Sequence, residues 1–402
     1  MRGYDATNAC YSNSSAPGIR GAVNWTLKLT TYEGFTNNPV AQNGYIYILY
    51  DNNPMYKSNF YLCCLNATNG EIIWNQTAVN PPLYRENLAG ISVAVDNGLV
   101  YTNSAAYNVT NGELAFNYEM PTNSSPVVSN GIIYTENGVL FALSANSGKL
   151  VWNTTFSVRN APTIANNIVY CDSWDYYLYA LKASNGDQIW RIKEPPDPYQ
   201  QVTVANGHIF AATYNATYCL DALNGKSIWN ATTSSQVYGI DTPIVADNIV
   251  VAGTCALDAA TGALIWNSST TFISEYPFSS AAADGLLYTY GSISSGKGGL
   301  YGLNEALFAF DIHTGEKIWQ YTFPAGNGGF DTYQDANPII ANGMVYVGSR
   351  TGRLYAFGSS TIPEHVNNQF DYQWILLTVV LLILVVVVTV LITVKRQKNR
   401  RK

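Results

Sequence analysis

Short segments that combine aromatic rings, carboxylates and guanidinium groups separate the strand-like stretches of this 402-residue chain. Aromatic rings stack on flat or apolar surfaces, and the charged groups form strong hydrogen bonds. Together they can hold a sugar, a peptide or a cofactor, and we predict that they lie on one binding face. The candidates are Tyr84, Arg85, Glu86, Arg159, Trp174, Tyr199, Tyr238, Asp241, Tyr276, Phe330, Asp331, Tyr333 and Asp335.

Signals for enzyme chemistry are few. The three histidines, His208, His313 and His365, are too scattered to suggest a zinc site. The chain also lacks a Gly-x-Ser-x-Gly elbow, a phosphate loop and a His-Glu-x-x-His motif. We therefore predict no catalytic residue and no metal ligand. The six cysteines, among them Cys10 and Cys171, are able to form structural disulfides outside the cell.

The elements that must position the candidates are internal repeats. The string LYALKASNGDQIW (178–190) returns with small changes as LCCLNATNGEIIW (62–74), LFALSANSGKLVW (140–152), TYCLDALNGKSIW (217–229), TCALDAATGALIW (254–266) and LFAFDIHTGEKIW (307–319). Before such strings stand alternating apolar runs interrupted by a turn, as in SPVVSNGIIY and NPIIANGMVY. Asn-Gly between two β-prone runs is a hairpin signal. Each unit therefore predicts four short strands in ~40 residues, which is typical of a propeller blade.

The two ends of the repeat region determine the number of blades. The last unit has three strands and no closing Trp, whereas GAVNW (21–25) has that ending without the strands before it. The N-terminal strand is therefore expected to complete the last blade and remove its exposed edge. The predicted fold is all-β, an eight-bladed β-propeller over residues 20–360. We expect one aromatic residue of each unit to pack against the next blade: Trp25, Trp74, Phe116, Trp152, Trp190, Trp229, Trp266 and Trp319.

A second set of small or polar residues precedes the first strand of each unit. These residues are expected to line a water-filled central channel, and they offer no evident general base. The set is Asn38, Ser92, Ser125, Ala161, Gln201, Thr242, Ser279 and Asn337.

The C-terminal region has the pattern of a membrane anchor. Residues 375–394 are a run of 20 residues without a charge, which at ~1.5 Å per residue matches a hydrocarbon core of ~30 Å. We predict a transmembrane helix there, preceded by a stalk at 361–374 and followed by a basic tail at 395–402. Because Lys and Arg favour the cytoplasmic side, the tail is expected inside and the propeller outside the cell.

The sequons agree with an extracytoplasmic propeller, whereas the N-terminal region shows no signal for export. Residues 1–19 form an N-terminal segment without an apolar signal region, so we expect a missing upstream signal or a processed start. Ten N-x-S/T triplets are predicted glycosylation acceptors, at Asn13, Asn24, Asn66, Asn75, Asn108, Asn123, Asn153, Asn215, Asn230 and Asn267. Four of these follow the repeat Trp directly and would share one outer position on successive blades.

The repeated pattern AxDxxxGxxxW around an eight-bladed ring resembles the quinoprotein dehydrogenase repeat. That repeat also occurs in non-catalytic relatives such as the outer-membrane assembly lipoprotein of the β-barrel machinery. In the enzymes, a carboxylate and an amide hold calcium, an Asp acts as base, a Trp stacks beneath pyrroloquinoline quinone (PQQ), and two adjacent cysteines form a disulfide above it. Cys63 and Cys64 are adjacent here, but neighbours in a strand point to opposite faces. Trp174 is the one Trp outside the repeat that would serve a quinone.

We expect a glycosylated, single-pass, cell-surface propeller that binds or scaffolds an envelope protein or glycan, without a cofactor. Prokaryotic repeats combined with dense sequons resemble an archaeal envelope protein. Without the tail, the chain keeps 15 basic against 27 acidic residues, which argues against a nucleic-acid partner. Two alternatives remain: an oxidoreductase that uses PQQ and calcium, and a purely structural envelope component.

Overall fold

A computed structural model of the chain describes most of the propeller region. The described residues are 22–30, 38–51, 60–79, 92–120, 122, 124–195, 199, 201–233, 242–268, 274–294, 303–324, 337–349 and 351–358, with the backbone alone for 51, 274–279, 292, 294 and 303. The chain divides into two units, Met1–Ser359 and Ser360–Lys402. All the described strands belong to the first unit.

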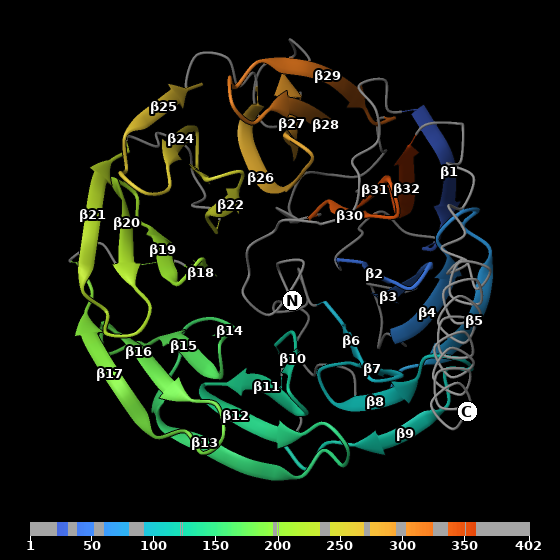
Figure 1. Ribbon diagram of the computed structural model, residues 1–402. Helices are drawn as coiled ribbons and strands as arrows, with labels where there is room; N and C mark the ends of the chain where they lie inside the picture. The colour runs from blue at the N-terminus through green and yellow to red at the C-terminus, as the bar shows by residue number, and fades with distance from the viewer. Residues whose placement is uncertain are drawn as a thin grey trace, which may run out of the picture. The chain divides into compact units, whose positions relative to one another are not determined.

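Eight four-stranded antiparallel sheets follow one another around a ring (Figure 1). Blades 1 to 4 are β2(Val40–Gln42), β3(Tyr45–Asp51), β4(Phe60–Asn66), β5(Ile72–Thr77); β6(Ala94–Asp96), β7(Leu99–Tyr101), β8(Ala105–Asn108), β9(Leu114–Asn117); β10(Val127–Ser129), β11(Ile132–Asn137), β12(Val139–Ser144), β13(Leu150–Ser157); and β14(Thr163–Ala165), β15(Ile168–Asp172), β16(Tyr177–Lys182), β17(Gln188–Lys193). Blades 5 to 8 are β18(Val202–Ala205), β19(His208–Ala212), β20(Ala216–Asp221), β21(Ser227–Thr232); β22(Ile244–Ala246), β23(Ile249–Ala252), β24(Cys255–Asp258), β25(Leu264–Asn267); β26(Ser274–Ala283), β27(Leu286–Ser294), β28(Leu303–Asp311), β29(Lys317–Thr322); and β30(Ile339–Ala341), β31(Met344–Gly348), β32(Arg353–Gly358) with β1(Ala22–Lys28).

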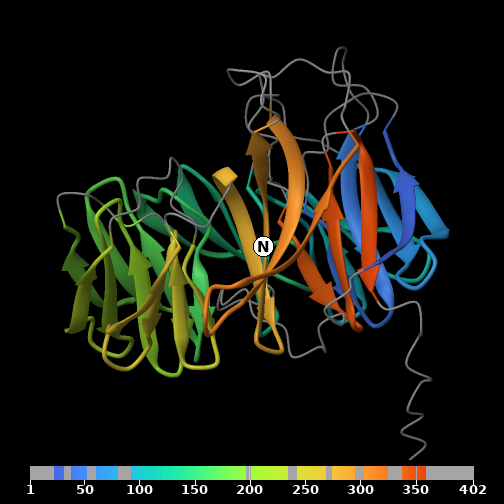
Figure 2. The same ribbon diagram turned by 90° about the horizontal axis from the view of Figure 1, so that it is seen from above.

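The N-terminal strand closes the ring. β1 pairs antiparallel with β32, with Val23 opposite Phe357 and Leu27 opposite Leu354. Blade 8 thus takes its outermost strand from the start of the chain, and the predicted all-β, eight-bladed propeller with this closure is confirmed. Figure 2 shows the ring from the side, with the strands running between its two faces.

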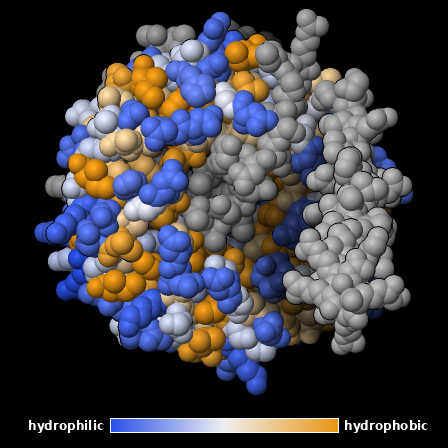
Figure 3. Space-filling model, viewed as in Figure 1, coloured by the Kyte–Doolittle hydropathy of each residue, from blue (hydrophilic) through white to orange (hydrophobic). Residues whose placement is uncertain are grey.

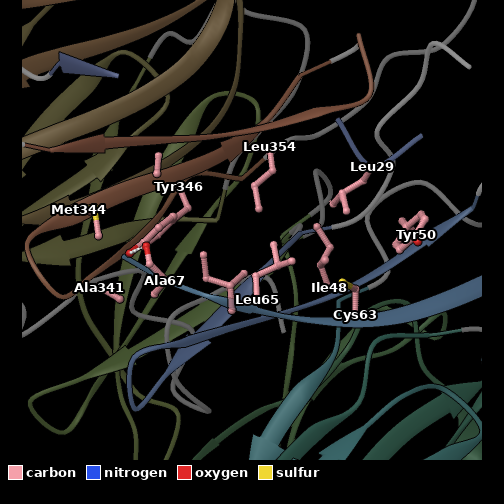
Figure 4. Close-up of a cluster of buried hydrophobic side chains, with 12 residues drawn as sticks. Leu29, Ile48, Tyr50, Cys63, Leu65, Ala67, Ala341, Met344, Tyr346 and Leu354 are labelled. Atoms are coloured by element: carbon pink, nitrogen blue, oxygen red, sulfur yellow. Dashed lines mark hydrogen bonds between the residues drawn. The ribbon is translucent and has the colours of Figure 1, made fainter. Parts of the chain in front are cut away.

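The hydrophobic core is divided into eight layers, one between each pair of neighbouring blades. In the layer that joins blades 8 and 1, the Tyr346 hydroxyl donates to the Ala67 carbonyl at 3.1 Å (Figure 4). Ile48 and Leu65 of blade 1 and Leu354 of blade 8 have no exposed surface in this layer. Because each blade buries both of its faces, no blade has a core of its own.

The tight turns have the conformations that the sequence requires. At the turn between β2 and β3, Asn43 and Gly44 have φ values of 52° and 80°. Such positive values favour Asn and Gly, and this pair gives the turn whose twist suits a two-residue hairpin.

The repeat Gly and the repeat Trp meet across blade boundaries. Trp152 of blade 3 lies over Gly186, which is in the turn between β16 and β17 of blade 4. The Trp152 indole N–H donates to the Ala183 carbonyl in the same turn at 2.9 Å. The same bond is formed by Trp25, Trp74, Trp190, Trp229 and Trp266 with the blade that follows each. Phe116 lies against Gly148 in the same way but has no N–H to donate.

The predicted transmembrane helix at 375–394, with its stalk and tail, lies outside the described residues. Among the residues that are described, no helix is long and apolar enough to cross a membrane.

Candidate functional site

The two faces of the ring carry different connections. The turns between first and second strands and between third and fourth strands form one face, which we call the turn face. The loops between second and third strands and the connections between blades form the other, which we call the loop face. Since strands alternate in direction, three segments around blade 4 meet on the loop face: the connection from β13 to β14, the loop from β15 to β16 and the connection that follows β17.

Arg159 lies at the centre of these three segments. Its guanidinium pairs with Glu194 through Nη2, and its Nε lies 3.2 Å from Asp172 Oδ2 without the geometry of a hydrogen bond. The Asn160 amide donates to the same Asp172 oxygen at 2.9 Å. The side chains of Arg159, Asp172 and Glu194 are 10%, 5% and 0% exposed. One cation therefore serves two buried carboxylates.

Burial dominates the electrostatics of the two acids. It raises the pKa of Asp172 to about 6, although Arg159 and Asn160 act in the opposite direction. It raises the pKa of Glu194 to about 7, again against Arg159. Glu194 Oε1 is buried and has no hydrogen-bond partner among the described residues. Keeping both carboxylates ionised beside a single guanidinium therefore costs free energy. Protonation of one of them removes that cost.

Two exposed aromatic rings stand beside this buried cation. The Arg159 guanidinium carbon lies 6.0 Å from the centroid of the Trp174 ring and 5.7 Å from that of Tyr176. Trp174 is 66% and Tyr176 53% exposed. A fixed cation beside two exposed rings on the loop face is the arrangement most suited to contacting a ligand in the described part of the chain.

The structure brings two of the predicted candidates together and separates a third. Arg159 and Trp174 are neighbours at this site. Tyr199 is only 3% exposed and packs edge-on against Tyr218, with ring centroids 5.4 Å apart, so it belongs to the core between blades 4 and 5. It is not accessible to a ligand. Tyr276 is described by its backbone alone, and Tyr84, Arg85, Glu86, Tyr238, Asp241, Phe330, Asp331, Tyr333 and Asp335 lie outside the described residues.

Sequence reasoning missed Asp172, Glu194 and Tyr176. Asp172 and Tyr176 flank Trp174 in the segment CDSWDYY. Because Trp174 lies outside the repeat motif, it could have indicated that its neighbours also belong to a site. Glu194 directly follows β17 in a charged segment that is typical of a solvated surface, and nothing in the sequence indicates its burial.

The buried acids predict how stability depends on pH. The pKa of Glu194 lies above its usual value of 4.5. The stability that the protonated Glu194 side chain contributes is therefore fully present below pH 4.5 and is lost as the pH rises through about 7. Between pH 5 and pH 8 the wild-type free energy of unfolding should fall by about 2–3 kcal/mol more than that of Glu194→Gln. Urea unfolding of the full chain in detergent at both pH values measures the difference. Glu113→Gln, at an exposed turn, is the control and should follow the wild type.

The inner polar residues join blades rather than line a channel. Asn38 Oδ1 accepts from the Asn337 N–H at 2.9 Å, and the Ser92 N–H donates to Ser125 Oγ at 2.8 Å. Asn38, Ser92 and Asn337 are buried. The expected water-filled lining is therefore wrong for these residues, because each is buried and forms a hydrogen bond to a neighbouring blade.

The five described cysteines are buried and unpaired, so the disulfides considered from the sequence are not formed among them; Cys10 lies outside the described residues. Cys63 lies in the layer between blades 8 and 1 (Figure 4), and Cys64 in the layer between blades 1 and 2. As expected for strand neighbours, the two thiols point to opposite faces. Burial raises the pKa of Cys63 to about 12 and that of Cys64 to about 11, which makes both unreactive.

Most of the described sequons are exposed. Their asparagines are Asn24, Asn75, Asn108, Asn153, Asn215, Asn230 and Asn267, whereas Asn66 is half-buried and bonds the Thr68 N–H within its turn. Asn13 and Asn123 lie outside the described residues. Their exposure leaves room for glycans, and the assignment of glycosylation stays a prediction.

The family is decided by a match that spans the propeller. The sequence model of the family described as outer membrane protein assembly factor BamB matches residues 16–134, 105–203 and 197–371. The chain belongs to the BamB family. The crystal structure of BamB from Moraxella catarrhalis has a TM-score of 0.60 and 17% identity, and the likeness covers 86% of this chain and 99% of that one. The expected PQQ-like repeat is thereby confirmed.

Two enzymes also resemble this BamB-family chain, one in its fold and the other in its sequence. Quinohemoprotein alcohol dehydrogenase from Comamonas testosteroni has a TM-score of 0.63 and 14% identity, covering 90% of this chain and 80% of that one. Tetrathionate hydrolase of Acidithiobacillus ferrooxidans is 24% identical over 346 residues, which are 83% of this chain and 58% of the enzyme. The chain thus spans less than two thirds of that relative, and the likeness to the alcohol dehydrogenase concerns the fold alone.

The described residues of this BamB-family chain do not fit a quinone with calcium. No group of three or more His, Cys, Asp or Glu side chains is placed to hold a metal in the part that the structure describes. The vicinal cysteines form no cap, and Trp174 stands beside Arg159 in a loop that follows the second strand of its blade. The inner positions Asn38, Ser92 and Asn337 carry no carboxylate.

Proposed function

We propose that the protein is a membrane-anchored, extracytoplasmic propeller that binds or scaffolds an envelope partner through the loop face around blade 4. The observation that carries the proposal is the pair of exposed rings, Trp174 and Tyr176, beside a guanidinium that two buried carboxylates hold in place. A rigid platform contacts a partner without the cost of ordering flexible side chains. No catalytic group and no cofactor is required for this role.

Three further points support a surface scaffold. The family is named for an outer membrane assembly factor, which is a binding rather than a catalytic role. The apolar run at 375–394 followed by six basic residues supports a single-pass anchor with the C-terminus in the cytoplasm. The ten sequons favour a glycoprotein, and together with a prokaryotic repeat they favour an archaeal envelope. The partner would be an envelope protein or glycan and not a nucleic acid.

Site-specific photo-crosslinking in the native envelope tests the loop face. Benzoylphenylalanine replaces Trp174 in the full-length chain, and in a matched variant it replaces Leu223, which is 70% exposed in a turn-face loop. Adducts from position 174 and none from 223 are the expected result. Adducts from 223 alone would assign binding to the turn face, and a lack of adducts from both would favour a purely structural component.

Two controls separate the remaining classes. Alkaline carbonate should leave the full chain in the membrane pellet and release a chain that ends at residue 372. Titration with PQQ and calcium should leave Trp fluorescence and melting temperature unchanged. Tight, calcium-dependent binding would instead establish the oxidoreductase alternative.

A further inference from the structure

Exposed aromatic rings gather on the loop face of two neighbouring blades. Four described aromatic side chains are more than a third exposed: Trp174, Tyr176, Tyr214 and Tyr45. The first three lie in the loops between the second and third strands of blades 4 and 5, which stand side by side in Figure 1. Tyr45 follows a turn on the opposite face. On the face that Figure 3 shows, hydrophobic patches alternate with hydrophilic ones around the ring.

Tyr176 holds a backbone conformation that its side chain disfavours. Its φ is 64°, and the other ten described non-glycine residues with positive φ are all Asn or Asp in turns between first and second strands. A side chain with a Cβ is strained in this region, and an aromatic one has no compensating local bond. Hydrogen bonds from Tyr176 N–H to Ser173 O (3.1 Å) and from Glu194 N–H to Tyr176 O (2.9 Å) hold it there. Asn would suit the turn better, so the backbone conformation does not account for the aromatic ring at this position.

Both loops are fixed before any ligand arrives. The Tyr177 N–H donates to Asp175 Oδ1 at 3.2 Å, and the Tyr179 hydroxyl donates to Asp175 Oδ2 at 2.7 Å. In blade 5 the Thr213 N–H donates to the Ala216 carbonyl at 2.8 Å, which closes the loop that carries Tyr214. The rings are thus presented on rigid supports, as stacking platforms are.

The charges around the rings select the class of ligand. Arg159 lies within 6.0 Å of both blade-4 ring centroids, and its charge is balanced by Asp172 and Glu194, so it offers little attraction to an anion. Both oxygens of Asp175 are already bonded. A neutral ring with an apolar face and polar edges, which is the surface of a sugar, matches these rings and needs neither an unpaired charge nor an open carboxylate oxygen.

We infer that the loops Ser173–Tyr176 and Thr213–Ala216 bind a neutral oligosaccharide, with sugar rings stacked on Trp174, Tyr176 and Tyr214. Packed sheets lie roughly 10 Å apart, a spacing that one oligosaccharide chain is long enough to bridge. This inference rests on the proposed role of the loop face and names the chemistry of its ligand.

Calorimetric titration of the full chain in detergent tests the inference. The probes are neutral hexaoses of glucose, mannose and N-acetylglucosamine, with hexalysine and hexaglutamate peptides as charged comparators. All proteins carry Asn215→Gln, so that no glycan on this sequon can occupy the Tyr214 platform. At least one hexaose should bind, and Trp174→Ala and Tyr176→Asn should each weaken it about tenfold. Tyr45→Ala, on the turn face, should bind like the parent.

The melting temperature of Tyr176→Asn separates a binding role from a structural one. It should equal or exceed that of the parent, because Asn tolerates the left-handed backbone. A clear drop in melting temperature would mean that the ring serves the fold and would overturn the inference. Hexaoses that fail to bind, or a preference for hexalysine, would overturn it as well. In that case protein adducts from position 174 would still support the proposed loop-face role, so the two failures are distinguishable.

Discussion

Replacing Arg159 by methionine should lower the free energy of unfolding by about 3–5 kcal/mol at pH 8. The substitution keeps an unbranched apolar stem and removes the cationic partner of two carboxylates that are almost completely buried, Asp172 and Glu194. Burial without a counter-ion penalises the charged form, so both acids would have to take up protons for the variant to fold. The loss should therefore shrink at pH 5, where protons neutralise them. Urea unfolding of the full chain at the two pH values measures it.

An exposed ion pair in the same blade is the matched control. Lys182 and Asp187 lie 3.3 Å apart with side chains 56% and 59% exposed. Lys182→Met should cost no more than about 1 kcal/mol at either pH, because solvent screens the pair and hydrates the remaining carboxylate. Equal losses for the two variants, or a loss at Arg159 that does not depend on pH, would contradict the account of a shared buried cation.

Gly186→Ala should cost about 3 kcal/mol, of which roughly half comes from the backbone and half from the packed ring. Gly186 has a φ of 74°, and a Cβ there would stand 2.7 Å from the Trp152 ring of the preceding blade. Either the indole or the turn must shift, which opens the layer between blades 3 and 4. The unfolding midpoint in urea gives the loss.

Gly207 separates the two contributions. Its φ is 78°, but nothing lies within 4 Å of a Cβ added there, so Gly207→Ala should cost only about 1–2 kcal/mol from the backbone. In a Trp152→Ala background, Gly186→Ala should likewise fall to the cost of Gly207→Ala, since the ring has gone. If Gly186→Ala costs as much with the ring removed as with it present, the indole contact contributes nothing.

The candidate site illustrates why loop chemistry resists prediction from sequence. Arg159 and Trp174 were recognisable as residue types that bind, but Tyr199 has the same character and is buried against Tyr218. The difference lies in which residues of a connection pack between blades and which remain at the loop face. Asp172 and Glu194 carry charges that the sequence pattern assigns to solvent, and only the convergence of three segments on one face removes them from it.

The number of strands in each unit, the closure by an N-terminal strand and the packing of the repeat Trp against the next blade could all be predicted from the residue pattern. These properties follow from short-range requirements: alternation within a strand, positive φ in a tight turn, and a ring placed at a constant distance from that turn. Three other properties emerged only from the folded chain: one guanidinium serves two buried acids, Tyr176 keeps its ring exposed on a strained backbone, and inner polar residues bond neighbouring blades. They depend on which distant segments exclude water from one another, and exclusion of water is a property of packed surfaces rather than of local sequence.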